Sequence, residues 1–286
     1  MRLLEYISPS RLSLFRKDPK LFYRKYQADI KMENDPPTDA MMVGTCFDVF
    51  IKQWLIAEGV VEEAGDLTLP KNEWCVGQGR RICESYLRGG NGNVLKEMCG
   101  YGAVTAEVVA NEYVEYKGTG VPLFGKPDLT VQGGETIVLD WKVNGGASVK
   151  RPSPVAGYTW RSKGGVSHKA AKLEGCGIPG IPAVSVADWG APWIEQVCIY
   201  GWLLGVPVGE PFIGAIDQLC CSKEAGLEEV VRHRGMIGEA FQLSLWNELC
   251  DMWSACMTGE YLAPDVRELL DTPAPDDSAF RSMLLS

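Results

Sequence analysis

The chain has 286 residues, of which 46% are apolar and 23% charged, and its formal net charge is −9. This composition is ordinary for a soluble globular protein with one large or two small domains. No run approaches the ~20 apolar residues of a transmembrane helix, and the first residues are too short and polar for a signal peptide, so we expect a cytoplasmic location and no membrane partner. The acidic balance argues only weakly against a nucleic-acid partner, because binding depends on local basic patches rather than on total charge.

The N-terminal segment reads as two short helices. Ser8 can cap the first helix with Pro9 at its first position, and Leu12 and Phe15 give it an apolar side. Pro19 starts the second helix. We expect this segment to cover an active site and contact substrate, although a solvated helix face is the alternative. Its basic residues are Arg11, Arg16, Lys17, Lys20, Arg24 and Lys25.

A loop over residues 29–39 is followed by a predicted helix over 40–58, whose apolar residues recur at helical spacing. Asp48 lies at the margin of that apolar face. Residues 60–100 are the least informative part of the chain.

The pattern becomes β-rich from Val104 to Lys117. Two acidic residues of this stretch, Glu107 and Glu112, are candidates for a functional site, and both could instead be solvent-facing strand residues.

Residues 125–143 predict a β-hairpin. We expect its turn at residues 132–135, where Gly133 and Gly134 would supply positive φ angles. Side chains alternate along a strand, so Asp140 and Lys142 share the polar face of the second strand. The hairpin would bring Asp128 beside them.

Two carboxylates and a lysine at one sheet edge suit metal-assisted hydrolysis of a phosphodiester. Asp128 and Asp140 would offer hard oxygen ligands to Mg²⁺ or Mn²⁺. Lys142 would orient the attacking water or stabilise the charge that builds on the phosphate. The alternative is a surface strand with a solvated Asp–Lys pair.

A long basic segment follows the hairpin. Between Val143 and Leu173 it has no acidic residue, and Tyr158 and Trp160 are interleaved with its cations, as in a surface that binds phosphates and stacks bases. A solvated loop is the alternative. The basic residues are Lys150, Arg151, Arg161, Lys163, Lys169 and Lys172.

The remainder predicts a helix from Pro192 to Leu204, two paired strands, a helix over 238–258 and a loosely ordered tail over 264–286. Gln196 and Tyr200 are four residues apart and therefore share one face of the predicted helix from Pro192 to Leu204.

These motifs, taken in order, resemble the PD-(D/E)XK nuclease superfamily, and within it the RecB-like and phage exonuclease branch. Pro127-Asp128 and Asp140-Trp141-Lys142 resemble the two halves of its signature. Three further pieces are similar to the branch: the opening SPSRLSLFRKDPKLFYRKY, GTCFD at residues 44–48, and QVCIY at residues 196–200.

The resemblance implies a role for each matching residue. Glu107 stands near an acidic position on the strand before Pro-Asp and, with Asp48, would be a further metal ligand; the family usually has His at position 48. Gln196 and Tyr200 would contact the DNA backbone or support the site. With Arg161, Lys163 and Arg11 they form the predicted substrate-binding set.

We therefore predict an α/β fold with a mixed central sheet flanked by helices, as one nuclease domain over 1–263 with N-terminal helices in 8–58 and a core over 104–234. The resemblance implies a Mg²⁺- or Mn²⁺-dependent DNA exonuclease, in phage or bacterial recombination, repair or degradation. It leaves open a single-strand annealing or recombination partner and a homo-oligomer. The alternative from another class is an inactive nuclease fold that binds nucleic acid or serves in assembly. An iron–sulfur cluster is not expected, because the ten cysteines lack the spacing that relatives use.

Overall fold

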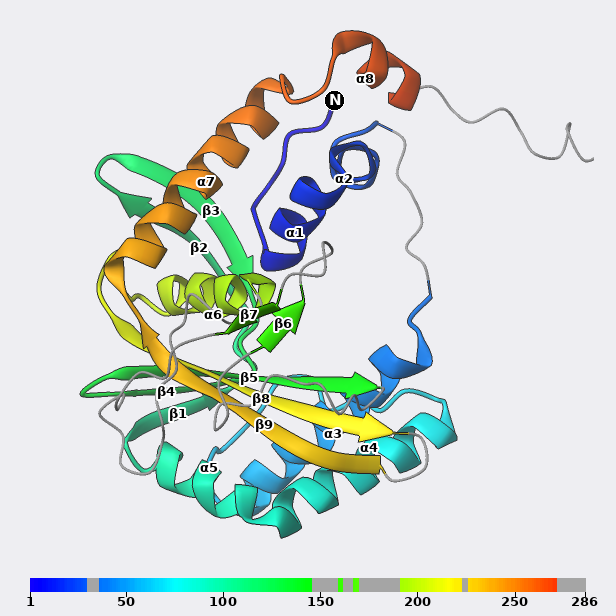
Figure 1. Ribbon diagram of the computed structural model, residues 1–286, viewed down its shortest axis with the longest axis vertical. Coiled ribbons are helices and arrows are strands. Elements are labelled where there is room, and N and C mark those ends of the chain that lie inside the picture. Colours follow the sequence, from blue (N-terminus) through cyan, green and yellow to red (C-terminus); the bar gives the residue numbers. More distant parts are fainter. Residues whose placement is uncertain (30–35, 146–158, 162–166, 170–190, 223–225, 272–286) are drawn as a thin grey trace, which may run out of the picture.

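The computed structural model describes residues 1–29, 36–145, 159–161, 167–169, 191–222 and 226–271. A five-stranded mixed sheet lies at its centre with helices on both faces (Figure 1), which confirms the predicted α/β architecture. The strand order is β1-β4-β5-β8-β9, and only β5 and β8 run parallel. The strands are β1 (Gly102–Ala106), β4 (Leu129–Gly133), β5 (Thr136–Gly145), β8 (Phe212–Ser222) and β9 (Gly226–Ile237).

Strand β5 places apolar side chains on both faces of the sheet. Ile137, Leu139 and Trp141 belong to one hydrophobic core, and Val138 belongs to the other. This is the alternation that the sequence predicts for the strand. Asp140 follows Val138 on the second face, so a buried carboxylate projects from the middle of the sheet.

The first face of the sheet is covered by α3 (Asp39–Ala57), α4 (Glu73–Tyr86) and α5 (Gly92–Cys99), with a π-helical turn, η1 (Leu87–Asn91), between the last two. Thr38 and Asn72 cap α3 and α4 by accepting hydrogen bonds from backbone N–H groups. α3 is long and apolar enough to cross a bilayer, but its residues pack into this core and it carries Asp48 and Lys52.

The second face is covered by α6 (Ala191–Leu203), which packs with the hairpin of β2 (Ala110–Tyr116) and β3 (Thr119–Gly125). Beyond them lie α1 (Pro9–Lys17), α2 (Pro19–Tyr26) and α7 (Glu239–Thr258) (Figure 1). Ser8 caps α1 and Asp18 caps α2, each with a proline at the first helical turn, as the sequence predicts for α1. The short strands β6 (Thr159–Arg161) and β7 (Ser167–Lys169) pair separately from the main sheet.

The N-terminal helices pack against the last two described helices. The Gln27 side-chain amide donates to the Cys256 carbonyl at 2.7 Å, and the Tyr23 hydroxyl donates to Asp271 at 2.8 Å. Asp271 ends α8 (Pro264–Asp271), so part of the stretch expected to be a loose tail is helical. In α1, Arg16 pairs with Glu195 of α6 and with Glu248 of α7.

One local prediction needs correction. Gly133 and Gly134 do not have positive φ angles. A Cβ at Gly133 would lie 2.2 Å from the Tyr101 carbonyl oxygen, so this glycine permits a close approach of the backbone before β1. The stretch from 104 to 117 is β-rich as predicted, and it forms two strands in different sheets with Glu107, whose φ is +55°, between them.

A buried ion pair ties β8 and β9 to α4. Arg234 donates to Asp217 at 2.5 Å, and the Tyr86 hydroxyl donates to the other Asp217 oxygen at 2.5 Å. The Trp141 indole N–H donates to the same hydroxyl at 3.4 Å, so the cluster includes a side chain of β5. Burial and the Asp217 charge together raise the pKa of Tyr86 well above its usual value.

We predict that Asp217→Asn lowers the free energy of unfolding by about 3–5 kcal/mol, because it leaves the Arg234 guanidinium buried without its counter-charge. Urea unfolding measures the change. Glu58→Gln is the control, since Glu58 pairs with Lys96 at the surface and its loss should cost about 1 kcal/mol or less. Equal effects of the two substitutions would contradict the prediction.

Candidate active site

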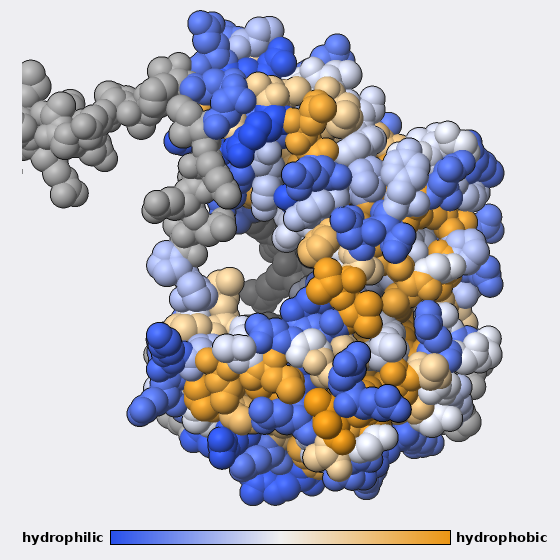
Figure 2. Space-filling view, turned by 180° about the vertical axis from the view of Figure 1, so that it is seen from behind, coloured by the Kyte–Doolittle hydropathy of each residue, from blue (hydrophilic) through white to orange (hydrophobic). Residues whose placement is uncertain are grey.

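Residues far apart in the sequence meet around one open cavity of about 600 Å³. Asp48 comes from α3, Glu107 from the residue after β1, Asp128 from the connection between β3 and β4, and Lys142 from β5. On the side turned toward the viewer in Figure 2, the molecule is hollowed between the part that carries α1 and α2 and the part that carries the sheet.

The hairpin fixes the two predicted catalytic aspartates. Asp128 accepts a hydrogen bond from the Trp141 backbone N–H at 2.8 Å, and its own carbonyl accepts from the Glu107 N–H at 3.0 Å. Asp140 is 2% exposed, and one of its oxygens lies 2.5 Å from the Lys142 ammonium. The register of β4 with β5 therefore brings together the Asp128, Asp140 and Lys142 side chains as the sequence suggests.

Helix α6 contacts Asp140 and Lys142 from the second face of the sheet. The Gln196 amide donates to Asp140 at 3.1 Å and to the Tyr200 hydroxyl at 2.7 Å, and its oxygen accepts from Lys142 at 2.8 Å. Burial and the Asp140 charge raise the pKa of Tyr200 above its usual value. Gln196 thus contacts Asp140 and Lys142 directly, and Tyr200 acts on them through Gln196.

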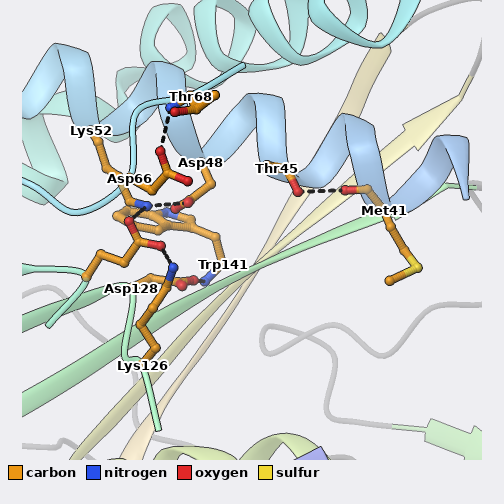
Figure 3. A network of polar contacts seen from close by, with 10 residues as sticks. Met41, Thr45, Asp48, Lys52, Asp66, Thr68, Lys126, Asp128 and Trp141 are labelled. Carbon is orange, nitrogen blue, oxygen red and sulfur yellow. Dashed lines mark hydrogen bonds and ion pairs between the residues drawn. The ribbon is translucent and has the colours of Figure 1, made fainter. Parts of the chain in front are cut away.

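Two lysines neutralise the carboxylates on the other side of the cavity. Lys52, one turn after Asp48 in α3, is fully buried and forms ion pairs with both Asp48 and Glu107. Lys126 forms an ion pair with the other oxygen of Glu107. Figure 3 shows Asp48 and Lys52 reaching down from α3 toward Lys126, Asp128 and Trp141.

The carboxylates resist ionisation because they are buried together. Burial raises the pKa of Asp128 well above its usual value, and the charges of Asp140 and Asp48 raise it further. Burial also raises the pKa of Asp48 and of Asp140, against the opposing effects of Lys52 and Lys142 respectively. A bound cation would relieve this repulsion.

The residues fit a hard divalent cation. The acidic residues that line the cavity offer carboxylate oxygens, the kind of ligand that Mg²⁺ and Mn²⁺ prefer. One oxygen of Asp48 is buried without a hydrogen-bond partner. Across the described part of the chain, no three acidic, imidazole or thiol side chains form a ready-made set for one ion. At this cavity the Lys52 ammonium pairs with both Asp48 and Glu107.

Three residues of the site, Lys52, Lys126 and Asp66, are not among those predicted from the sequence. Lys52 carries a weak signal, because it is four residues after Asp48 on a helix. Lys126 directly precedes Pro127-Asp128. Asp66, in the stretch without clear pattern, lines the same cavity and accepts hydrogen bonds from Thr68 that lower its pKa.

The predicted substrate-binding residues fall in different places. Arg11 lines a second cavity that adjoins the first. Arg161 ends β6, and Lys163 lies outside the described residues, as does most of the basic segment. Glu112, the alternative to Glu107, is exposed on β2 and does not line the catalytic cavity.

A sequence model described as the PD-(D/E)XK nuclease superfamily matches residues 6–158. The chain belongs to this superfamily. The match includes Asp48, Glu107, Asp128, Asp140 and Lys142, and nucleases of this superfamily generally use divalent metals such as Mg²⁺.

The other comparisons add little. No curated protein gives a significant match. A solved structure from Eubacterium rectale, named an exonuclease by inference, is 17% identical, with 95% of this chain and 90% of that chain covered and a TM-score of 0.46. The structure of the protein SSO0001 is 14% identical, with coverages of 88% and 95% and a TM-score of 0.27. Neither likeness carries an argument about activity.

We predict that Lys52→Met destabilises the metal-free nuclease fold by about 3–5 kcal/mol, because Asp48 and Glu107 lose a buried counter-charge. Mn²⁺ should raise the melting temperature of this variant more than that of the unaltered protein, since the ion would replace the lost charge. Differential scanning calorimetry with and without Mn²⁺ measures both effects.

Lys126→Met is the matched control, because Lys126 contacts the same Glu107 but is 43% exposed. Its effect on stability should be about 1 kcal/mol or less. A Lys52→Met protein as stable as the unaltered one, with the same response to Mn²⁺, would show that Lys52 does not balance the charge of this site.

Proposed function

We propose that the chain is a metal-dependent deoxyribonuclease that hydrolyses phosphodiester bonds from DNA ends. The observation that carries this proposal is the meeting of Asp128 and Lys142 at one cavity, with Asp140 paired to Lys142 behind them and Glu107 and Asp48 beside them. Membership in the nuclease superfamily supports hydrolysis of a phosphodiester. The choice of an exonuclease rests on the resemblance of the N-terminal and Gln-x-x-x-Tyr motifs to the RecB-like and phage branch.

Asp128 and Asp140 would hold the metal ion, and Glu107 and Asp48 would be further ligands. When bound, the ion supplies Lewis-acid polarisation of the phosphate and makes water more acidic. The protein supplies the orientation of the ligands. The Trp141 N–H fixes Asp128, and Gln196 fixes Asp140, so neither carboxylate has to be reoriented during the reaction.

Lys142 supplies a positive charge beside the reacting phosphate. Its ammonium is held between Asp140 and the Gln196 oxygen, and its side chain lines the cavity. From this position it can stabilise the negative charge that develops on the phosphate oxygens and orient the attacking water. Tyr200 keeps the Gln196 amide turned toward Asp140 and so acts through its neighbour.

The proposed activity is tested with end-labelled linear DNA and closed circular DNA, each incubated with Mg²⁺, Mn²⁺ or EDTA. We expect mononucleotides or short products from linear DNA with either metal, no cleavage with EDTA, and intact circles. Cleavage of circles would contradict the end-dependent mode. Binding without cleavage under any metal would instead favour the inactive, nucleic-acid-binding alternative.

We predict that Asp140→Asn lowers the cleavage rate at least a hundredfold, because it removes a metal ligand and the partner of Lys142. The folded state should persist, since the amide can still accept from Gln196. Single-turnover cleavage and thermal unfolding measure the two effects. Glu112→Gln, an exposed change on β2, is the control and should cleave normally. A folded Asp140→Asn protein with full activity would remove Asp140 from the catalytic set.

A further inference from the structure

A second cavity of about 490 Å³ adjoins the catalytic cavity. Lys126 and Lys142 line both cavities, so the two meet across these side chains. Gln196 and Tyr200, which hold the catalytic group, line the second cavity as well. A ligand that fills it therefore lies next to the site where the phosphodiester is cut.

The second cavity has aromatic walls that come from four separate elements. Tyr6 precedes α1, Tyr26 ends α2, Phe124 lies in β3 and Trp193 lies in α6. Backbone hydrogen bonds from Ile7 to Pro122 and from Phe124 to Ile7 place Tyr6 beside Phe124, with ring centroids 4.7 Å apart. All four side chains are only partly buried, so aromatic surface remains exposed in the cavity.

One cation belongs to this cavity alone. The Arg11 guanidinium lies 3.7 Å from the centre of the Tyr6 ring and 4.5 Å from that of Tyr26, and it donates to the Tyr6 carbonyl at 2.7 Å. Stacking between two rings holds a guanidinium in one plane and leaves its charge at the cavity. Three serine side chains, Ser8, Ser10 and Ser13, line the same space.

The two cavities differ in the charges that line them. Four carboxylates line the catalytic cavity, whereas no acidic side chain of the described residues lines the second one, although the whole chain has a net charge of −9. The second cavity thus combines the Arg11 cation, two lysines that also pair with Glu107 and Asp140, hydroxyl groups and aromatic faces. These are the features that bind a nucleotide, whose phosphate is anionic and whose base stacks on aromatic rings.

We propose that this cavity holds an unpaired nucleotide next to the scissile phosphate, so that the substrate strand reaches the catalytic cavity as a single strand. The inference rests on the proposed nuclease function and extends it to a substrate class. A base inside a duplex is covered on both faces by its neighbours, whereas an unpaired base can stack on protein side chains. Tyr6, Phe124 and Trp193 would contact the base, and Arg11 the phosphate backbone.

Binding in EDTA tests the cavity separately from cleavage. The probe is a fluorescently labelled single-stranded oligonucleotide, compared with a blunt duplex of equal length. We expect Tyr6→Leu, Phe124→Leu and Arg11→Lys each to weaken single-strand binding by roughly ten- to a hundredfold and duplex binding much less. Arg11→Lys keeps the charge and removes the planar stacked group.

Lys20→Gln is the matched control, because Lys20 is an exposed cation on α2 that does not line the cavity. Its effect should be small and the same for both DNA forms. Unchanged single-strand affinity in the Tyr6 and Phe124 variants, with normal thermal unfolding, would overturn the proposal, as would losses no greater than that of Lys20→Gln.

Photocrosslinking locates the base directly. A single strand with 5-iodouracil near its end should crosslink to peptides that contain Tyr6, Phe124 or Trp193, and the Leu variants should lose the crosslink at the altered residue. Crosslinks found only elsewhere would refute the cavity. The two proposals can fail separately: crosslinks without any cleavage contradict the nuclease, and cleavage with unaltered binding by the variants contradicts the cavity.

Discussion

The close approach of four carboxylates, those of Asp48, Glu107, Asp128 and Asp140, is the constraint on which the rest of the structure depends. Removing a single carboxylate from water costs several kcal/mol even after the protein relaxes, so each needs a counter-charge or hydrogen-bond donors within reach. Lys52 serves Asp48 and Glu107, Lys142 serves Asp140, and a backbone N–H serves Asp128. These partners come from both faces of the sheet, so α3 and α6 must both be packed before the site exists.

The sheet makes that requirement possible because its central strand β5 is buried on both faces. Trp141 packs toward α3 and α4, where its indole joins the cluster of Tyr86, Asp217 and Arg234. Its neighbours Asp140 and Lys142 point the other way, toward α6. Because successive side chains of a strand point to opposite faces of the sheet, β5 links the hydrophobic core on one face to the catalytic group on the other.

The sequence predicted the parts of the site that depend on local rules. Strand alternation places Asp140 with Lys142, the hairpin brings Asp128 beside them, and helical spacing puts Gln196 with Tyr200. What it could not show depends on contacts between distant segments. From the sequence, Lys52 is only a helical neighbour of Asp48. Its second ion pair, with Glu107, joins residues 55 positions apart, so no local pattern predicts it.

The prediction of positive φ angles at the hairpin glycines was wrong for the same reason. The close backbone approach at Gly133 involves Tyr101, which no local pattern places there. Glu107 is placed by the break between β1 and β2, which the sequence, described only as β-rich over this stretch, does not locate. Arg161 and Lys163 stay predictions, because the structure does not describe their side chains.

The packing of the first helices against the last ones affects how the protein can be made. Domains generally fold as units during synthesis. Here Leu12 and Phe22, near the start, belong to the same core as Leu249 and Cys256 of α7. The opening helices can meet β3 and α6 earlier, but their packing is complete only when α7 has also left the ribosome.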